Sequence, residues 1–160
     1  MIVVSDTTTI SYLLQLGRLS ILRQLYGSVP IPSAVVDELT AFHEADELLN
    51  GNNWLIIAEP SSLETVAELQ NNPDLDMGEC AAIVLAEERS ADLLIIDEIN
   101  GRKEATVRGL RIIGLLGVLI VAKKKGVVER IAPIVASLQK FGFRVSSVLV
   151  DRVLREVGES

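Results

Sequence analysis

The sequence predicts an α/β fold with a mostly parallel sheet and helices on both of its faces. Short apolar runs typical of strands alternate with helical segments along the 160 residues. The chain is also 49% hydrophobic but only 4% aromatic, so its core consists mainly of Val, Ile, Leu and Ala, as in sheets covered on both faces. One domain spanning residues 1–160 is expected, because this length can bury a proper core.

Gly and Pro separate most of the predicted elements. Gly17 parts the first two helices, and Pro32 lies at the entry of the third, where its fixed φ suits a first turn. Turns are expected at residues 50–53 and 71–74, and the strand after residue 53 is expected at an outer edge of the sheet. The expected strands are residues 1–5, 29–32, 54–58, 93–96 and 110–113, and the expected helices are residues 10–16, 19–26, 33–41, 77–89, 98–108 and 115–125.

Two amphipathic helices are expected at about residues 128–157. Pro133 should lie in or near a first turn, or kink its helix. Both helices are expected to cover the sheet, and the alternative is that they bind a partner. Their apolar residues recur at helical spacing: Val128, Ile131, Ile134, Val135 and Leu138 in one, and Val145, Val148, Leu149, Val153, Leu154 and Val157 in the other.

The charges are segregated along the chain. A net charge of −7 argues at first sight against a nucleic-acid partner. However, residues 36–100 hold sixteen acids and the single base Arg89, whereas residues 101–125 hold seven bases and the single acid Glu104. The basic stretch could hold a phosphate backbone, provided that cations lie in the acidic stretch. Two ordinary solvated faces are the alternative.

Four acids occupy comparable positions: Asp6, Glu38, Glu79 and Asp97. Asp6 and Asp97 directly follow predicted strands, and the carboxyl ends of parallel strands meet at the edge where open α/β sheets bind ligands. Glu38 and Glu79 are expected to open helices that start from this edge. The structural alternatives are helix caps at Asp6 and Asp97, a capping box of Asp76 and Glu79, a surface position for Glu38 beside Asp37, and an exposed ion pair of Glu98 with Arg102.

Four carboxylates gathered at one edge would raise one another's pKa unless a cation were bound. Hard oxygen ligands suit Mg²⁺ or Mn²⁺, which need few protein ligands and keep waters for substrate phosphates. Such a site can activate water for phosphodiester cleavage. The four acids together therefore predict a metal site.

Four stretches form an ordered set of motifs: SDTTTISYL, IPSAVVDEL, LDMGECAAIVLA and LLIIDEINGRKEATVRGLRIIGLLGVLIVAKKKGVV. This set resembles the successive motifs of PIN-domain proteins, most closely the compact prokaryotic branch related to VapC-type toxin ribonucleases. The similarity runs from Met1 to about Gly126, and GFRVSSVLVDRVLREVGE resembles the closing helix of that branch. One departure is that Glu79 stands where many toxin members have Asp.

The resemblance implies a three-layer α/β/α sandwich and a Mg²⁺- or Mn²⁺-dependent endoribonuclease that leaves a 5′-phosphate and a 3′-hydroxyl. It also implies RNA as substrate, an antitoxin protein as a partner, a homodimer and no membrane. Asp37 is the poorer ligand, because consecutive helical residues point about 100° apart. By motif, the implied metal-binding and catalytic acids are Asp6, Glu38, Glu79 and Asp97, with Glu98 as a further ligand, and the implied orienting or substrate-binding residues are Thr7, Thr8, Arg102 and Lys103.

Residue types exclude several other functions. Cys80 is the only cysteine, which excludes an internal disulfide and a Cys-rich zinc site. His43 is the only histidine, which excludes a ribonuclease that works with two imidazoles, and it is expected at the surface. The chain has no dinucleotide or P-loop motif. No apolar run reaches the ~18 residues of a membrane span, so a soluble cytoplasmic protein is expected.

An alternative function is a catalytically weak PIN-fold binding module that pairs with an antitoxin-like protein or with itself. The acidic pocket would then accept an Arg or Lys side chain in place of a metal. Calorimetry with Mn²⁺ discriminates the two functions, because only a metal site gives heat and thermal stabilisation.

Overall fold

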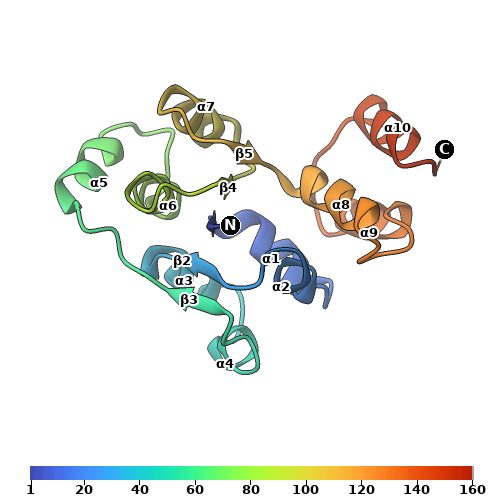
Figure 1. The fold of residues 1–160 in the computed structure, drawn as a ribbon, viewed down its shortest axis with the longest axis horizontal. Coiled ribbons are helices and arrows are strands. Elements are labelled where there is room, and N and C mark those ends of the chain that lie inside the picture. The colour runs from blue at the N-terminus through green and yellow to red at the C-terminus, as the bar shows by residue number, and fades with distance from the viewer. Residues whose placement is uncertain (160) are drawn as a thin grey trace.

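The computed structural model describes residues 1–159, so Ser160 of the expected domain lies outside the described residues. Strands and helices alternate along the chain (Figure 1). The elements are β1 (Val3–Ser5), α1 (Thr7–Gln15), α2 (Ser20–Tyr26), β2 (Val29–Ile31), α3 (Ser33–Thr40), α4 (Ala45–Leu49), β3 (Leu55–Ile57), α5 (Leu63–Gln70), α6 (Met77–Glu88), β4 (Leu93–Ile95), α7 (Ile99–Val107), β5 (Ile112–Ile113), α8 (Leu115–Lys124), α9 (Ala132–Lys140) and α10 (Ser147–Glu156).

The strands are parallel within two hydrogen-bonded groups. One has the order β1-β4-β5, with Val3 opposite Leu93 and Ser5 opposite Ile95. The other consists of β2 and β3, and β2 lies next to β1, so the two groups share one central layer. The strands that end before Asp6 and Asp97 are therefore neighbours, as the sequence predicted.

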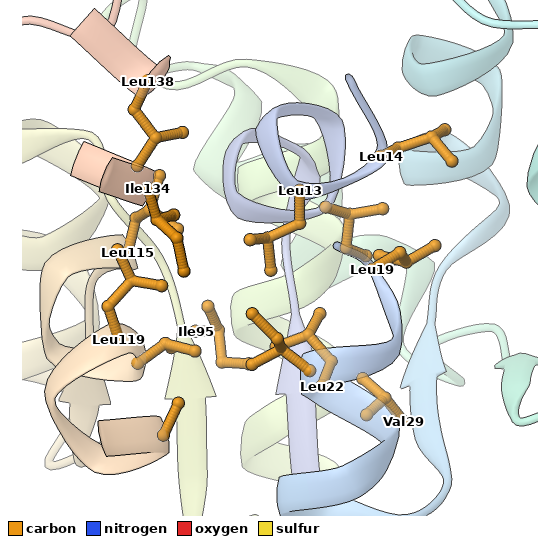
Figure 2. Close-up of a cluster of buried hydrophobic side chains, with 14 of the residues drawn as sticks. Leu13, Leu14, Leu19, Leu22, Val29, Ile95, Leu115, Leu119, Ile134 and Leu138 are labelled. Atoms are coloured by element: carbon orange, nitrogen blue, oxygen red, sulfur yellow. The ribbon is translucent and has the colours of Figure 1, made fainter. Parts of the chain in front are cut away.

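Alternate residues of the strands point to opposite faces of this layer. Val3 and Ile95 pack on one face with α1, α2, α8 and α9, whereas Val4 and Leu94 pack on the other with α5, α6 and α7. Figure 2 shows the first face, where Leu13 from α1 lies across from residues of α8 and α9, with Ile95 between them. The fold is thus a three-layer α/β/α sandwich, which confirms the predicted class.

Helix α6 is deeply buried. Its residues from Gly78 to Ala86 are all buried, and small Gly and Ala side chains let β1, β4, α3 and α5 approach it closely. A capping box begins the helix: Asp76 accepts from the Glu79 amide, and Glu79 accepts from the Asp76 amide. The first turn of α6 is therefore held firmly where it meets the ends of β1 and β4.

Helices α4 and α5 were not predicted from the sequence. Each buries only one or two apolar side chains, Leu48 in α4 and Val66 with Leu69 in α5. With five and eight residues, these helices are too short for a repeated apolar stripe that would reveal them in the sequence. Ser62 begins α5 by accepting from the Thr65 amide, which is a cap that the sequence does show.

The two C-terminal helices are shorter than predicted. Helix α9 begins at Ala132, and Val128 and Ile131 are buried in the segment before it; Pro133 lies in the first turn as expected. In α10 only Val153 is buried and Val148 is 68% exposed, so the prediction that this helix covers the sheet is wrong. Helix α10 lies beyond α8 and α9 in Figure 1, and it covers these helices rather than the sheet. No helix within residues 1–159 is both long enough and apolar enough to span a bilayer.

Candidate active site at the carboxyl edge of the sheet

Asp6 lies between β1 and α1, at the edge where β1 and β4 end. Its amide donates to the Ile95 carbonyl at 3.0 Å, which continues the pairing of the two strands. Its side chain is only 2% exposed, makes no capping hydrogen bond, and leaves Oδ1 without a partner among the described residues. The interpretation of Asp6 as a simple side-chain cap is therefore wrong.

Glu79 is the third residue of α6 and is 4% exposed. Oε1 accepts from the Asp76 amide at 3.1 Å, which confirms the predicted capping box. Oε2 is buried and has no partner among residues 1–159. One oxygen of Glu79 thus serves the helix, and the other is free to bind a ligand.

Glu38 connects three helices around the site. Oε1 accepts from the Thr7 hydroxyl of α1 at 2.5 Å, and Oε2 accepts from the Gly78 amide of α6 at 3.0 Å. Glu38 lies near the end of α3, so the prediction that it opens a helix is wrong. Thr7 orients Glu38 rather than Asp6, while the neighbouring Asp37 is exposed.

Asp97 follows β4, and its Oδ1 accepts from the Leu115 amide at 3.0 Å. This bond fixes Asp97 to the start of α8 and not to α7, the next helix in the chain. Glu98 is exposed at the cap position of α7 and makes no capping bond. Within residues 1–159 it forms no ion pair with Arg102, so that structural alternative is wrong as well.

Burial and mutual repulsion disfavour the charged forms of these acids. Burial raises the pKa of Asp6 well above its ordinary value, and the negative charges of Glu79 and Asp76 raise it further. Burial, together with Asp76 and Glu98, raises the pKa of Glu79 to about 7. No Lys or Arg within the described range pairs with any of these acids. A bound cation would remove the cost of keeping them charged.

The donor set fits a hard divalent cation. Asp6 Oδ1 and Glu79 Oε2 are buried carboxylate oxygens without partners, and Mg²⁺ is commonly held by one or two carboxylates with waters in its other positions. No three Asp, Glu, His or Cys side chains of residues 1–159 lie close enough to enclose a metal ion. Glu38 and Asp97 already accept hydrogen bonds from backbone amides, Glu38 from Gly78 and Asp97 from Leu115.

Three glycines make room for the carboxylates. A Cβ at Gly78 would overlap Glu38 Oε1, one at Gly101 would overlap Glu79 Oε2, and one at Gly114 would lie 2.8 Å from Asp97 Oδ1. None of these glycines has a positive φ, so they are required by space and not by backbone conformation. These roles were not predicted from the sequence, although each glycine lies within one of the motifs that resemble PIN-domain proteins.

A groove of about 640 Å³ extends from Asp97 between β5, α8 and the α10 segment. Arg102, Arg144 and Arg152 line this groove together with apolar side chains, whereas Lys103 does not line it. Sequence reasoning found Arg102 but missed Arg144 and Arg152, which lie outside the basic stretch. Other cations of that stretch pair with acids: Arg108 with Glu87, Lys123 with Glu159, and Lys124 with Glu156, which lines the groove.

A family model described as DUF3368, PIN domain, matches residues 2–159. No curated protein matches the chain. The match covers nearly the whole sequence, and the parallel α/β/α sandwich with acids at its carboxyl edge agrees with it. The chain belongs to the PIN-domain family.

Proposed function

We propose that this protein is an endoribonuclease that depends on Mg²⁺ or Mn²⁺. PIN domains are generally nucleases that use divalent metals. The observation that carries the proposal is the pair of buried, unpartnered oxygens on Asp6 and Glu79, whose pKa values are both raised. Two buried carboxylate oxygens without donors do not stabilise the fold. A bound cation best explains why Asp6 and Glu79 place them there.

Asp6 and Glu79 would hold the metal directly, with Glu38, Asp97 and Glu98 around it. When bound, the ion supplies Lewis acidity, which activates water and neutralises charge on a phosphodiester. The amides of Gly78 and Leu115 keep Glu38 and Asp97 oriented, so neither carboxylate must be ordered when substrate arrives. Thr7 holds Glu38 in the same way, which gives this residue a positioning role.

The arginine-lined groove supports an RNA substrate. Arg102, Arg144 and Arg152 line the same groove as Asp97, so a phosphate backbone in it would run directly to the acids. Guanidinium groups suit phosphates because they donate in a planar fork. This arrangement resolves the conflict between a net charge of −7 and a polyanionic substrate, since the cations are gathered where the backbone would lie.

The proposal is tested with the full chain on mixed single-stranded RNAs. Cleavage is expected with Mn²⁺, is expected to stop with EDTA, and should fall at least about 100-fold in Asp97→Asn. Asp37→Asn is the matched control, because Asp37 is exposed beside Glu38, and it should cleave normally. Products should carry a 5′-phosphate and a 3′-hydroxyl. Cleavage that survives both EDTA and Asp97→Asn would contradict the proposal.

A catalytically weak binding module that pairs with an antitoxin-like protein is a second proposed function, which one surface favours. A cavity of about 560 Å³ beside Glu38 is lined by Leu63 and Met77, which are 71% and 54% exposed, and by Asp37 and Glu59. An apolar segment that carries Lys or Arg would match it. If partner binding replaces metal binding, Mn²⁺ should give neither heat nor stabilisation. In that case the nuclease proposal fails.

A further inference from the structure

We propose that a second cavity beside the acids binds one nucleobase of single-stranded RNA and thereby selects the base next to the cleaved bond. This inference rests on the proposed ribonuclease function. The cavity has a volume of about 560 Å³ and lies between α1, the segment after α3, and the end of α9. A volume in this range accommodates a small ligand such as a nucleotide.

Aromatic side chains are concentrated in this cavity. The chain has only six Phe, Tyr and Trp residues, and three of them, Tyr12, Phe42 and Phe141, line it. Phe42 is 85% exposed and Phe141 is 48% exposed, although exposed Phe rings do nothing for the fold. The Tyr12 ring is fixed edge-on against Phe143, with centroids 5.4 Å apart. The cavity therefore offers one fixed ring and two accessible rings on which a base can stack.

Polar groups in the same cavity suit the edge of a base. The Ser11 hydroxyl lies 2.9 Å from His43 Nε2, and the side chain of Gln15 also lines the cavity. Together they offer both donors and acceptors. His43, which the sequence placed at the surface, is half-buried and is held by Ser11.

The charges of the cavity favour a base over a phosphate. Its lining contains no Lys or Arg within the described residues, whereas the groove that extends from Asp97 contains three arginines. Glu98 adds a negative charge that would repel a phosphate. The groove and the cavity therefore differ in chemistry, and we expect backbone contacts in the groove and base contacts in the cavity.

The cavity borders the acid site through Thr7 and Glu98. Thr7 lines it and donates to Glu38, and Glu98 lines it next to Asp97. A base that stacks on Phe42 and Phe141 would thus belong to a nucleotide adjacent to the phosphate at the acids. The aromatic cavity would determine which nucleotide occupies that position.

The test uses the double variant Phe42→Ala/Phe141→Ala in the full chain. Ile57→Ala is the matched control, because Ile57 is a 50% exposed apolar residue on β3 that lines neither the groove nor either cavity. The first measurement uses a short single-stranded oligouridine with one 2-aminopurine and the Asp97→Asn background, so that no cleavage occurs. The fluorescence should change on binding, and the double variant should bind at least about 5-fold more weakly.

The second measurement maps cleavage sites on mixed RNAs with Mn²⁺. The unmodified chain should prefer one base beside the cut, and the double variant should lose this preference. Cleavage with the same base preference and the same affinity in the double variant would overturn the cavity proposal but leave the ribonuclease intact. Base-dependent binding that the double variant loses, without cleavage by the unmodified chain, would instead overturn the ribonuclease proposal alone. Absence of a fluorescence change would overturn the cavity proposal.

Discussion

Two buried carboxylate settings in this protein differ in how the charge is compensated. At the chain end, the Glu159 side chain is 3% exposed, accepts from the amides of Ile131 and Ala132 at 2.8 and 2.9 Å, and lies 3.2 Å from Lys123. Burial alone would raise the pKa of Glu159, but these two amides and Lys123 lower it below the ordinary value. At the sheet edge, Asp6 and Glu79 are equally buried, and the pKa of each is raised.

The difference shows that donors, and not burial, decide whether a buried carboxylate stabilises a fold. Glu159 ties the end of the chain to the beginning of α9 and so fixes α10, which carries Arg152, against the body of the protein. Asp6 Oδ1 and Glu79 Oε2 have no donor within residues 1–159, so a bound ligand would supply what these two oxygens lack. We therefore interpret the first setting as structural and the second as functional.

The largest effect on stability is expected from Glu159→Ala. The substitution leaves the Ile131 and Ala132 amides without an acceptor and Lys123 without its partner, so the free energy of unfolding should fall by about 3 kcal/mol. Urea unfolding measures this change. Glu156→Ala is the control: Glu156 is 49% exposed and pairs with Lys124, so its loss should cost less than about 1 kcal/mol. Equal losses in the two variants would remove the distinction between a compensated buried carboxylate and a surface pair.

A smaller change in the free energy of unfolding, of opposite sign, is expected from Glu79→Gln in metal-free protein. Gln can keep the capping box, while the charge that burial disfavours is removed. The raised pKa of about 7, against an ordinary value of 4.5, means that unmodified protein loses stability as the pH rises from 4.5 through 7. At pH 8 the variant should be more stable by on the order of 1–2 kcal/mol.

The Glu159 setting should show the reverse pH dependence. The pKa of Glu159 is lowered from its ordinary value of 4.5. The stability that this carboxylate contributes is therefore fully present above pH 4.5 and is lost as the pH falls through the lowered pKa. The stability difference between Glu159→Ala and unmodified protein should therefore shrink as the pH falls below 4.5, whereas that between Glu79→Gln and unmodified protein should already shrink as the pH falls from about 7 to 4.5. A Glu79→Gln variant that is less stable at pH 8 would contradict our interpretation of this side chain.

The sequence predicted the parts of the fold that repeat a pattern. Apolar runs located all five strands, and the positions of Asp6 and Asp97 after two of them placed both acids at one edge before the pairing of β1 with β4 was known. The capping box of Asp76 and Glu79 was also visible, because it depends on residues only three apart. Apolar runs and the chemistry of residues close in the sequence were sufficient to predict these features.

Features that depend on contacts between distant residues could not be predicted. Nothing local indicates that Thr7 donates to Glu38, 31 positions away, or that Glu159 accepts from the amide of Ile131. The arginine-lined groove combines Arg102 with Arg144, which the charge pattern placed in different regions. The low aromatic content likewise concealed that half of the aromatic residues line one cavity.

Thermal unfolding at pH 8 with increasing Mn²⁺ tests most directly whether the sheet edge binds a cation. The unmodified chain should show a saturable rise in Tm, equivalent to about 2.7 kcal/mol when Mn²⁺ reaches 100 times its Kd. Asp6→Asn should lose most of this rise, while Glu156→Ala, which removes an acid paired with Lys124, should retain it. No rise in the unmodified chain, or an equal rise in Asp6→Asn, would contradict the assignment of Asp6 and Glu79 as cation ligands.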